Sequence, residues 1–153
     1  GKRLGLQMKR AGVDHMILDS SKRGFKKGLV TLWKLTKIVV PVYFFVNLLK
    51  FSGALDTISA WFEPTMRLLG LPGEASLVLV LGNCINLYAG IGAIVSLSLT
   101  IKQITILAVM LSFSHSLFLE SAVAKRTGVS LIMVVLVRLS LAILSGLVLN
   151  LVL

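Results

Sequence analysis

The chain has 153 residues, of which 56% are hydrophobic and only 14% are charged. An ordinary soluble domain is about a quarter charged, and a soluble fold of this composition would expose an aggregation-prone apolar surface. The composition therefore excludes an ordinary soluble domain. It predicts an all-α integral membrane protein, a compact helical bundle with room for roughly four to six segments of about 20 residues each.

The first 28 residues are polar and basic, so we expect a cytoplasmic N-terminal segment (residues 1–28) ahead of a membrane-embedded domain (residues 29–153). The net charge is +10, and residues 1–37 hold ten of the sixteen lysines and arginines. Residues 14–25 suit a short interfacial helix, and the rest of the segment is expected to be a tether. Basic residues beside a first span predict a cytoplasmic N-terminus in a bacterial inner membrane and contact with anionic lipid. No nucleic-acid motif accompanies the charge, so nucleic acid is not an expected partner.

The first membrane span is predicted at residues 29–49. Pro41 is expected to kink it, because proline removes one backbone donor. The uncharged centre, residues 38–49, is too short alone to cross about 30 Å of hydrocarbon, so the preceding turns must enter with their lysines snorkelling. Residues 50–74 alternate apolar and charged positions at helical spacing, which is typical of an amphipathic interfacial helix. Pro64 is expected to end or bend that helix.

A turn at residues 70–73 precedes two uncharged segments with polar centres. Residues 75–99 are long enough to span, but glycines and asparagines occupy their middle, so this helix is expected to face protein or water and to break. Residues 103–119 end in a run of serines and a histidine, and residues 129–153 form the last apolar segment. If every segment crosses fully, Lys125 lies outside; if one only re-enters, Lys125 lies inside. Re-entrant or discontinuous helices are the favoured interpretation.

Asn83, Asn86 and Gly90 form the first candidate binding group. Uninterrupted helical spacing would place them on one face, where the amides offer donors and acceptors to a polar solute or cation. Helix packing explains the same residues equally well, because small and amide residues join membrane helices. Cys84 has no neighbouring base, which favours packing over chemistry, and as the single cysteine it excludes an intrachain disulfide.

The second candidate group places two hydroxyls, an imidazole and a carboxylate on one predicted helical face: Ser112, His115, Ser116 and Glu120. Burying an ionisable residue in a membrane is costly unless it is paired, so such a residue suggests function. A histidine titrates near neutrality, which suits it to carrying protons. The alternative is a polar seam in which Glu120 pairs with Lys125 or Arg126. Arg138 suits an anionic solute, a lipid headgroup, or a pair with Glu120 or Glu74.

Catalytic and cofactor signatures are weak in this sequence. The serines near His115 share a helix with it, and neither a nucleophile elbow nor a third triad member appears. One histidine and one nearby carboxylate fall short of a metal site, and no phosphate-binding glycine loop with a lysine occurs. We therefore expect a protein that is not an enzyme and that carries no metal and no cofactor.

Five short runs carry a family resemblance: GLPGEA at residues 70–75, LGN at 81–83, IGAI at 91–94, SFSHS at 112–116 with Glu120, and AKRTG at 124–128. They resemble bacterial nucleoside-recognition (Gate) domain membrane proteins, in the small stand-alone form of the domain. The similarity covers roughly residues 29–153. It implies a helical membrane domain with paired polar-centred segments that form a gate or solute site. Related segments occur in concentrative nucleoside transporters, ferrous-iron transporters and spore-maturation membrane proteins, so the cargo stays open.

The leading hypothesis is a small inner-membrane transport-type protein that binds or moves a small polar solute, nucleoside-like or an ion. A single Gate unit is expected to need a partner, most simply another copy, so a homo-oligomer is expected. The predicted substrate-binding residues are Asn83, Asn86, Ser112, His115, Ser116 and Glu120. The second hypothesis is a non-transporting membrane scaffold or accessory subunit of a larger complex, in which the same residues hold helices together.

Overall fold

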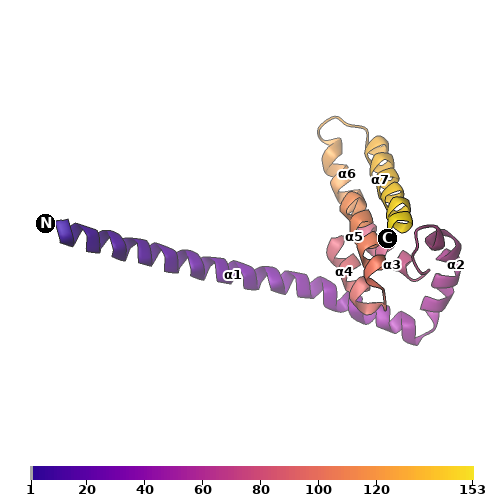
Figure 1. The fold of residues 1–153 in the computed structure, drawn as a ribbon, viewed down its shortest axis with the longest axis horizontal. Helices are drawn as coiled ribbons and strands as arrows, with labels where there is room; N and C mark the ends of the chain where they lie inside the picture. Colours follow the sequence, from indigo (N-terminus) through magenta and orange to yellow (C-terminus); the bar gives the residue numbers. More distant parts are fainter. Residues whose placement is uncertain (1) are drawn as a thin grey trace. The chain divides into compact units, whose positions relative to one another are not determined.

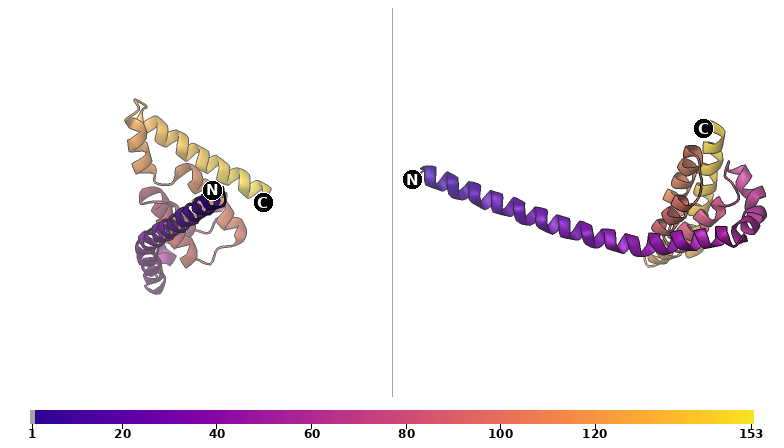
Figure 2. Two further views of the ribbon diagram at one scale, coloured as in Figure 1. Left: turned by 90° about the vertical axis from the view of Figure 1, so that its left-hand side faces the viewer. Right: turned by 90° about the horizontal axis from the view of Figure 1, so that it is seen from below.

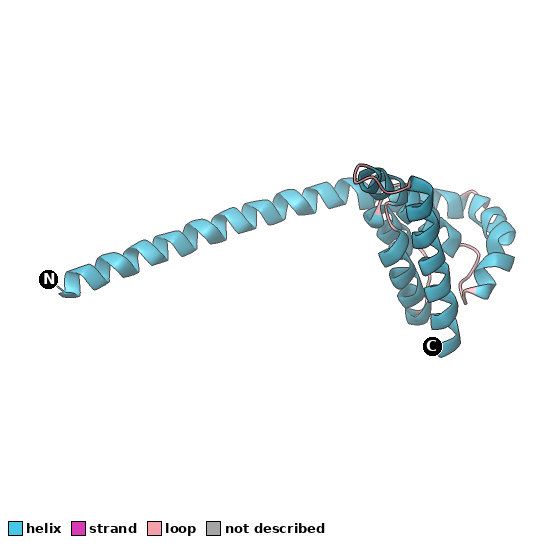
Figure 3. Cartoon of the chain, turned by 90° about the horizontal axis from the view of Figure 1, so that it is seen from above, coloured by secondary structure: helices cyan, strands magenta, loops and turns pink. Residues whose placement is uncertain are grey.

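Helices account for the regular secondary structure in the described part of the chain (Figure 1; Figure 3). The computed structural model describes the backbone of residues 2–153 and the side chains of residue 13 and residues 15–153. In chain order the helices are α1 (Lys2–Phe51), α2 (Ala54–Leu68), α3 (Ala75–Cys84), α4 (Leu87–Ser96), α5 (Ile101–Ser114), α6 (Leu117–Lys125) and α7 (Leu131–Val152). The all-α fold predicted from composition is confirmed.

The chain divides into two compact units, residues 1–37 and residues 38–153. In the first unit, α1 is helical from Lys2 onward, so the expectation of a tether is wrong, and the helix expected at residues 14–25 is part of a longer one. Lysine, arginine and leucine are good helix formers, and each glycine in a helix costs only about 1 kcal/mol. Several interspersed glycines therefore do not interrupt this helix.

Neither proline ends the helix that contains it. α1 continues through Pro41 to Phe51, and α2 continues through Pro64 to Leu68. Pro64 therefore does not end its helix, and the alternative expectation, that it bends the helix, stays a prediction. α2 is amphipathic as predicted: Leu55 and Met66 are buried.

Helices α3 and α4 form a hairpin of two short helices. Each has 10 residues, so each is about 15 Å long, half the thickness of a hydrocarbon layer. A Cβ added to Gly90 would lie 3.1 Å from the Cα of Gly82 and 3.4 Å from the carbonyl oxygen of Val78, so the backbones of the two helices touch. The predicted break within residues 75–99 is confirmed, and it lies at residues 85–86.

Helices α5 and α6 together form one candidate membrane span of 25 residues, and α7 forms another of 22 residues. α7 packs along both α5 and α6, and Figure 2 shows it beside them from two sides. Gly146 permits this approach, since a Cβ there would lie 2.8 Å from the sulfur of Met110. α5 begins with a capping box in which Thr100 and Gln103 satisfy each other's backbone N–H groups.

Several helix ends meet at one end of the second unit. Lys50 at the end of α1 donates from Nζ to the carbonyl oxygen of Ser96 at the end of α4. Lys102 at the start of α5 donates to the carbonyl oxygen of Asn150 near the end of α7, at 3.1 Å. The Asn150 amide in turn donates to the carbonyl oxygen of Leu68 at the end of α2, at 3.2 Å. The loop between α6 and α7 therefore lies at the opposite end, one span length away.

The core of the second unit takes buried side chains from α1, α2, α3, α4, α5 and α7. Its buried side chains include Met66, Val78, Ile106, Leu107 and Leu111. The exterior is also apolar: most of the apolar length of α7 is not buried within the protein. Three helices of the described chain are long and apolar enough to cross a membrane. Lipid is the solvent that accepts such an exterior, so this is an integral membrane protein.

Candidate functional site at two helix breaks

Two interrupted helices meet in the middle of the second unit. The chain leaves α3 at residues 85–86 and leaves α5 at residues 115–116. The backbone N–H of Ser116 donates to the carbonyl oxygen of Gly82 at 2.9 Å, which joins the second break to the last turn of α3. Helix breaks expose backbone donors and acceptors that hydrocarbon cannot satisfy. Here the two breaks partly satisfy each other.

Asn86 creates the first break. Its backbone is extended, and its side-chain Oδ1 accepts from the backbone N–H of Ala89 at 3.0 Å, which starts α4. Asparagine is among the preferred residues at this position, because its side chain satisfies a donor that the first helical turn leaves free. Asn86 therefore has a structural role that the sequence alone did not separate from binding.

Ser116 marks the second break with a strained backbone. Its φ is 48°, and it is the one non-glycine residue with positive φ in the described part of the chain. Residues outside glycine rarely adopt this left-handed conformation, and holding them there costs of order 1–3 kcal/mol. The hydrogen bond to Gly82 and the burial of Ser116 hold it in place. Strain of this kind gathers at binding sites and switches.

A three-member charged network spans the second break. His115 Nε2 lies 3.1 Å from Glu120 Oε1, and Arg138 Nη2 lies 2.6 Å from Glu120 Oε2. The other ring nitrogen of His115, Nδ1, lies 2.8 Å from the carbonyl oxygen of Leu111. Glu120 thus bridges the C-terminal end of α5 to α7. The pair of Glu120 with Arg138 is one of the alternatives that the sequence left open, and the pairs with Lys125 and Arg126 do not form.

Arg138 also closes the C-terminal end of α5. Its Nε donates to the carbonyl oxygen of Phe113 at 2.8 Å, and its Nη2 donates to the carbonyl oxygen of His115 at 2.9 Å. The last carbonyls of a helix lack partners within the helix and carry partial negative charge. A guanidinium in that position neutralises both the carbonyls and Glu120.

Four buried side-chain polar atoms have no partner among the described residues: Ser76 Oγ near the start of α3, and Asn83 Oδ1, Ser121 Oγ and Arg138 Nη1, which belong to residues in this junction or next to it in the chain. Asn83 follows Gly82, the acceptor of the bond between the breaks, and Ser121 follows Glu120. Ser121 is fully buried, with 0% of its surface exposed. A buried polar atom without a partner costs roughly 1–3 kcal/mol, so three of them at one junction mark a place suited to a hydrogen-bonding ligand.

The predicted binding residues divide between this junction and its surroundings. His115, Ser116 and Glu120 lie within it, and Asn83 lies beside it. Ser112 is exposed and donates to the carbonyl oxygen of Val109 at 2.6 Å. The predicted faces that united Asn83 with Gly90, and Ser112 with Glu120, do not exist, because both assumed a helix that runs through a break.

Ser121 was missed by the sequence reasoning. It lies in an apolar helix one position after Glu120, outside the spacing that selected the other residues. Glu74 occupies the N-cap position of α3 without a side-chain hydrogen bond. Instead Glu63 accepts from the backbone N–H of Gly73 at 2.7 Å, just before that helix.

Comparison with known proteins gives membrane relatives. The chain is 45% identical over 129 residues to the uncharacterized membrane protein YvoD of Bacillus subtilis, which covers 84% of this chain and 41% of that protein. It is 34% identical over 102 residues to the inner membrane protein YjiG of Escherichia coli strain K12, covering 64% of each. The chain thus spans less than two thirds of the length of either relative. No solved structure matches it.

A family match covers the region that contains both helix breaks. The Gate family, described as nucleoside recognition, matches residues 32–130. This range includes the α3–α4 hairpin, the second break and Glu120. It excludes Arg138, which completes the charged network from α7. The chain belongs to the Gate (nucleoside recognition) family of membrane proteins.

Proposed function

We propose that this protein binds a small polar solute, nucleoside-like or an ion, at the junction of its two helix breaks and acts in its transport. The observation that carries the proposal is the set of buried atoms without partners, Asn83 Oδ1, Ser121 Oγ and Arg138 Nη1. They offer two acceptors and one charged donor beside backbone groups freed by the breaks. Discontinuous helices of this kind hold substrates and ions at the centre of many transporters.

The charged network suits proton coupling in such a transporter. The imidazole of His115 contacts a carboxylate that Arg138 also holds, so a change in protonation of His115 alters the contacts of Glu120. Glu120 in turn joins the broken end of α5 to α7. Protonation would therefore act on the break itself, and neither enzyme chemistry nor a cofactor is needed.

A second copy of the chain completes the site in this proposal. The side chain of Glu120 is 47% exposed, although it lies on a candidate membrane span. A carboxylate facing lipid is costly, so a protein surface or water must cover it. A homo-oligomer supplies that surface with the fewest components.

The test is a thermal-shift screen of the detergent-purified protein with nucleosides, nucleobases, small organic acids and divalent metal ions. We expect at least one solute to raise the Tm of wild type, by an amount equivalent to about 2.7 kcal/mol at 100 times its Kd. Ser121→Ala and Asn83→Leu should abolish the shift. Both should leave the Tm without solute at or above the wild-type value, because removing an unpaired buried group costs little.

Ser96→Ala is the matched control. Ser96 is also buried, but its hydroxyl donates to the carbonyl oxygen of Gly92 at 2.8 Å, away from the junction. This variant should keep the full solute-induced shift. The proposal fails if no solute stabilises wild type, or if Ser121→Ala and Asn83→Leu bind as wild type does.

A non-transporting scaffold or accessory subunit is the second candidate. Two of the predicted binding residues favour a scaffold, since Asn86 caps α4 and Ser112 forms a hydrogen bond within its own helix. In a scaffold, the polar residues at the breaks hold helices together. Ser121→Ala and Asn83→Leu would then lower the Tm of the protein without solute, and no solute would change it.

A further inference from the structure

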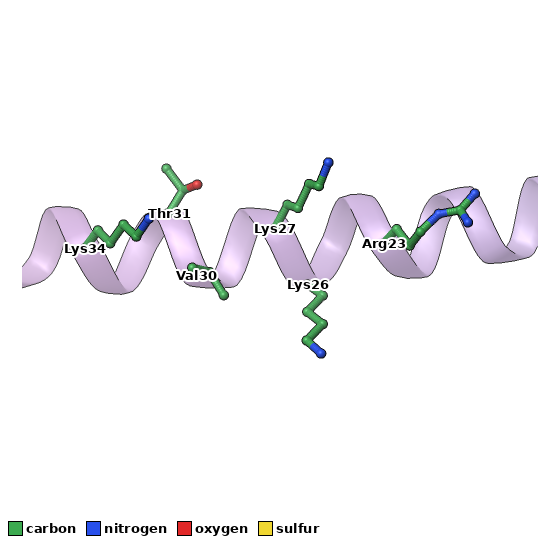
Figure 4. Close-up of a pocket in the computed structure, with 6 residues that line it drawn as sticks. All are labelled: Arg23, Lys26, Lys27, Val30, Thr31 and Lys34. Carbon is green, nitrogen blue, oxygen red and sulfur yellow. The ribbon is translucent and has the colours of Figure 1, made fainter.

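A basic face on α1 remains outside the proposed solute site. It lines a shallow surface pocket (Figure 4) with the residues Arg23, Lys26, Lys27, Val30, Thr31 and Lys34. At 100° per residue, the four cationic side chains fall within an arc of about 100° around the helix. All four are exposed. Residues 20–55 contain no aspartate or glutamate, so no acidic side chain from this part of the chain neutralises the face.

The opposite side of the same helix is apolar. It carries Leu18, Phe25, Leu29 and Leu32, which are 60%, 71%, 52% and 60% exposed. These four fall within an arc of about 60°, centred roughly opposite the cations. A helix with a basic face and an exposed apolar face is typical of a segment at a membrane surface.

Trp33 lies at the edge of the basic face. The Nζ of Lys37 lies 5.5 Å from the centre of the Trp33 ring, in a cation–π contact. Tryptophan favours the headgroup level of a bilayer, and a lysine stem turns its charge toward the same level. The pair therefore places the basic face beside lipid phosphates.

We propose that this face of α1, formed by Arg23, Lys26, Lys27 and Lys34, binds the phosphate headgroups of anionic phospholipids. Arginine offers phosphate a two-pronged hydrogen bond, and lysine offers a compact charge. A zwitterionic lipid carries its own cation beside the phosphate, so it gains less from this face. A nucleic acid would satisfy the cations but leave the apolar side of the helix exposed, whereas a bilayer covers both.

The test uses the fluorescence of Trp33 in the full chain. The protein has two tryptophans, so Trp61→Phe leaves Trp33 as the only reporter; Trp61 is 80% exposed, and the change should not affect folding. The protein is reconstituted in phosphatidylcholine vesicles that contain rising fractions of brominated phosphatidylglycerol, or of brominated phosphatidylcholine. Bromine quenches the tryptophan only at close range. We expect phosphatidylglycerol to be preferred at least tenfold at low salt, and less at high salt.

A fourfold variant should prefer phosphatidylglycerol by no more than about twofold, since each cation near a surface is worth roughly fivefold. It combines Arg23→Gln, Lys26→Gln, Lys27→Gln and Lys34→Gln. Glutamine is a comparable helix former, so circular dichroism should show unchanged helix content. Lys125→Gln with Arg126→Gln removes exposed cations elsewhere and should keep the preference. Equal quenching by both lipids in wild type overturns the proposal. So does a preference that survives the fourfold change.

Discussion

At the residue scale, three cations of the second unit donate hydrogen bonds to backbone carbonyls at helix ends. Lys50 donates to a carbonyl of the last residue of α4, Lys102 to one near the end of α7, and Arg138 to two at the end of α5. Water normally solvates these terminal carbonyls, but lipid cannot. A charged side chain in an apolar sequence costs free energy. Here these charges prevent a larger cost, because they satisfy backbone carbonyls that would otherwise lack hydrogen-bond donors.

Arg138→Gln tests this role directly. It removes the guanidinium from Glu120 and from the carbonyl oxygens of Phe113 and His115. Leaving such acceptors without partners should lower the free energy of unfolding by about 1–3 kcal/mol. SDS titration of the protein in mixed micelles, followed by circular dichroism, would measure the change.

The double variant Arg138→Gln with Glu120→Gln isolates the charge pair. It removes the unbalanced carboxylate, so it should recover part of the loss, and the two single changes should not add. If Arg138→Gln alone unfolds at the same SDS fraction as wild type, the guanidinium does not hold the end of α5.

At the element scale, sequence and structure agree where residue composition decides and differ where tertiary contacts decide. The break near Asn86 was predictable, because glycines and asparagines disfavour a helix in lipid. The break at Ser116 was not placed, because a left-handed serine is stable only with the carbonyl of Gly82 from another helix opposite it. The predicted face that united Ser112 with Glu120 failed for that reason, whereas the face that united Asn83 with Gly90 failed at the break near Asn86. Arg138 could be proposed as a partner of Glu120, but the orphaned hydroxyl of Ser121 depends on packing that no local pattern reports.

The tight link between α2 and α3 gives a prediction at this scale. A Cβ on Gly73 would overlap the backbone carbonyl of Ser59 in α2, whereas one on Gly28 in α1 would meet nothing within 4 Å. Gly73→Ala should therefore destabilise the fold by about 1–3 kcal/mol through overpacking. Gly28→Ala should be neutral or stabilise by up to about 1 kcal/mol, because alanine is the better helix former. Equal thermal stability of the two variants would contradict the close approach of α2 to this turn.

At the scale of the whole molecule, the α3–α4 hairpin leads to a prediction of the membrane topology, in which the hairpin re-enters the membrane without crossing it. The end of α1 and the end of α4 are joined by Lys50 and Ser96, so we expect the turn at residues 52–53 and the link at residues 97–100 on one side of the membrane. The span formed by α5 and α6 then crosses to the other side, and α7 returns. Two crossings then precede the loop at residues 126–130, so we expect it on the side of the basic N-terminus, which we propose to be cytoplasmic.

Cysteine accessibility tests this topology in intact cells. In a Cys84→Ser background, single cysteines replace Ser52, Ser98 and Thr127, all exposed positions. A membrane-impermeant maleimide should label positions 52 and 98 from outside, and position 127 only after the cells are permeabilised. If the α3–α4 segment crosses fully, position 127 should be labelled from outside and position 98 only after the cells are permeabilised. Position 52 should still be labelled from outside. Position 52 reports the orientation of the first span, and positions 98 and 127 report whether the hairpin re-enters. The experiment therefore tests the orientation and the re-entry independently.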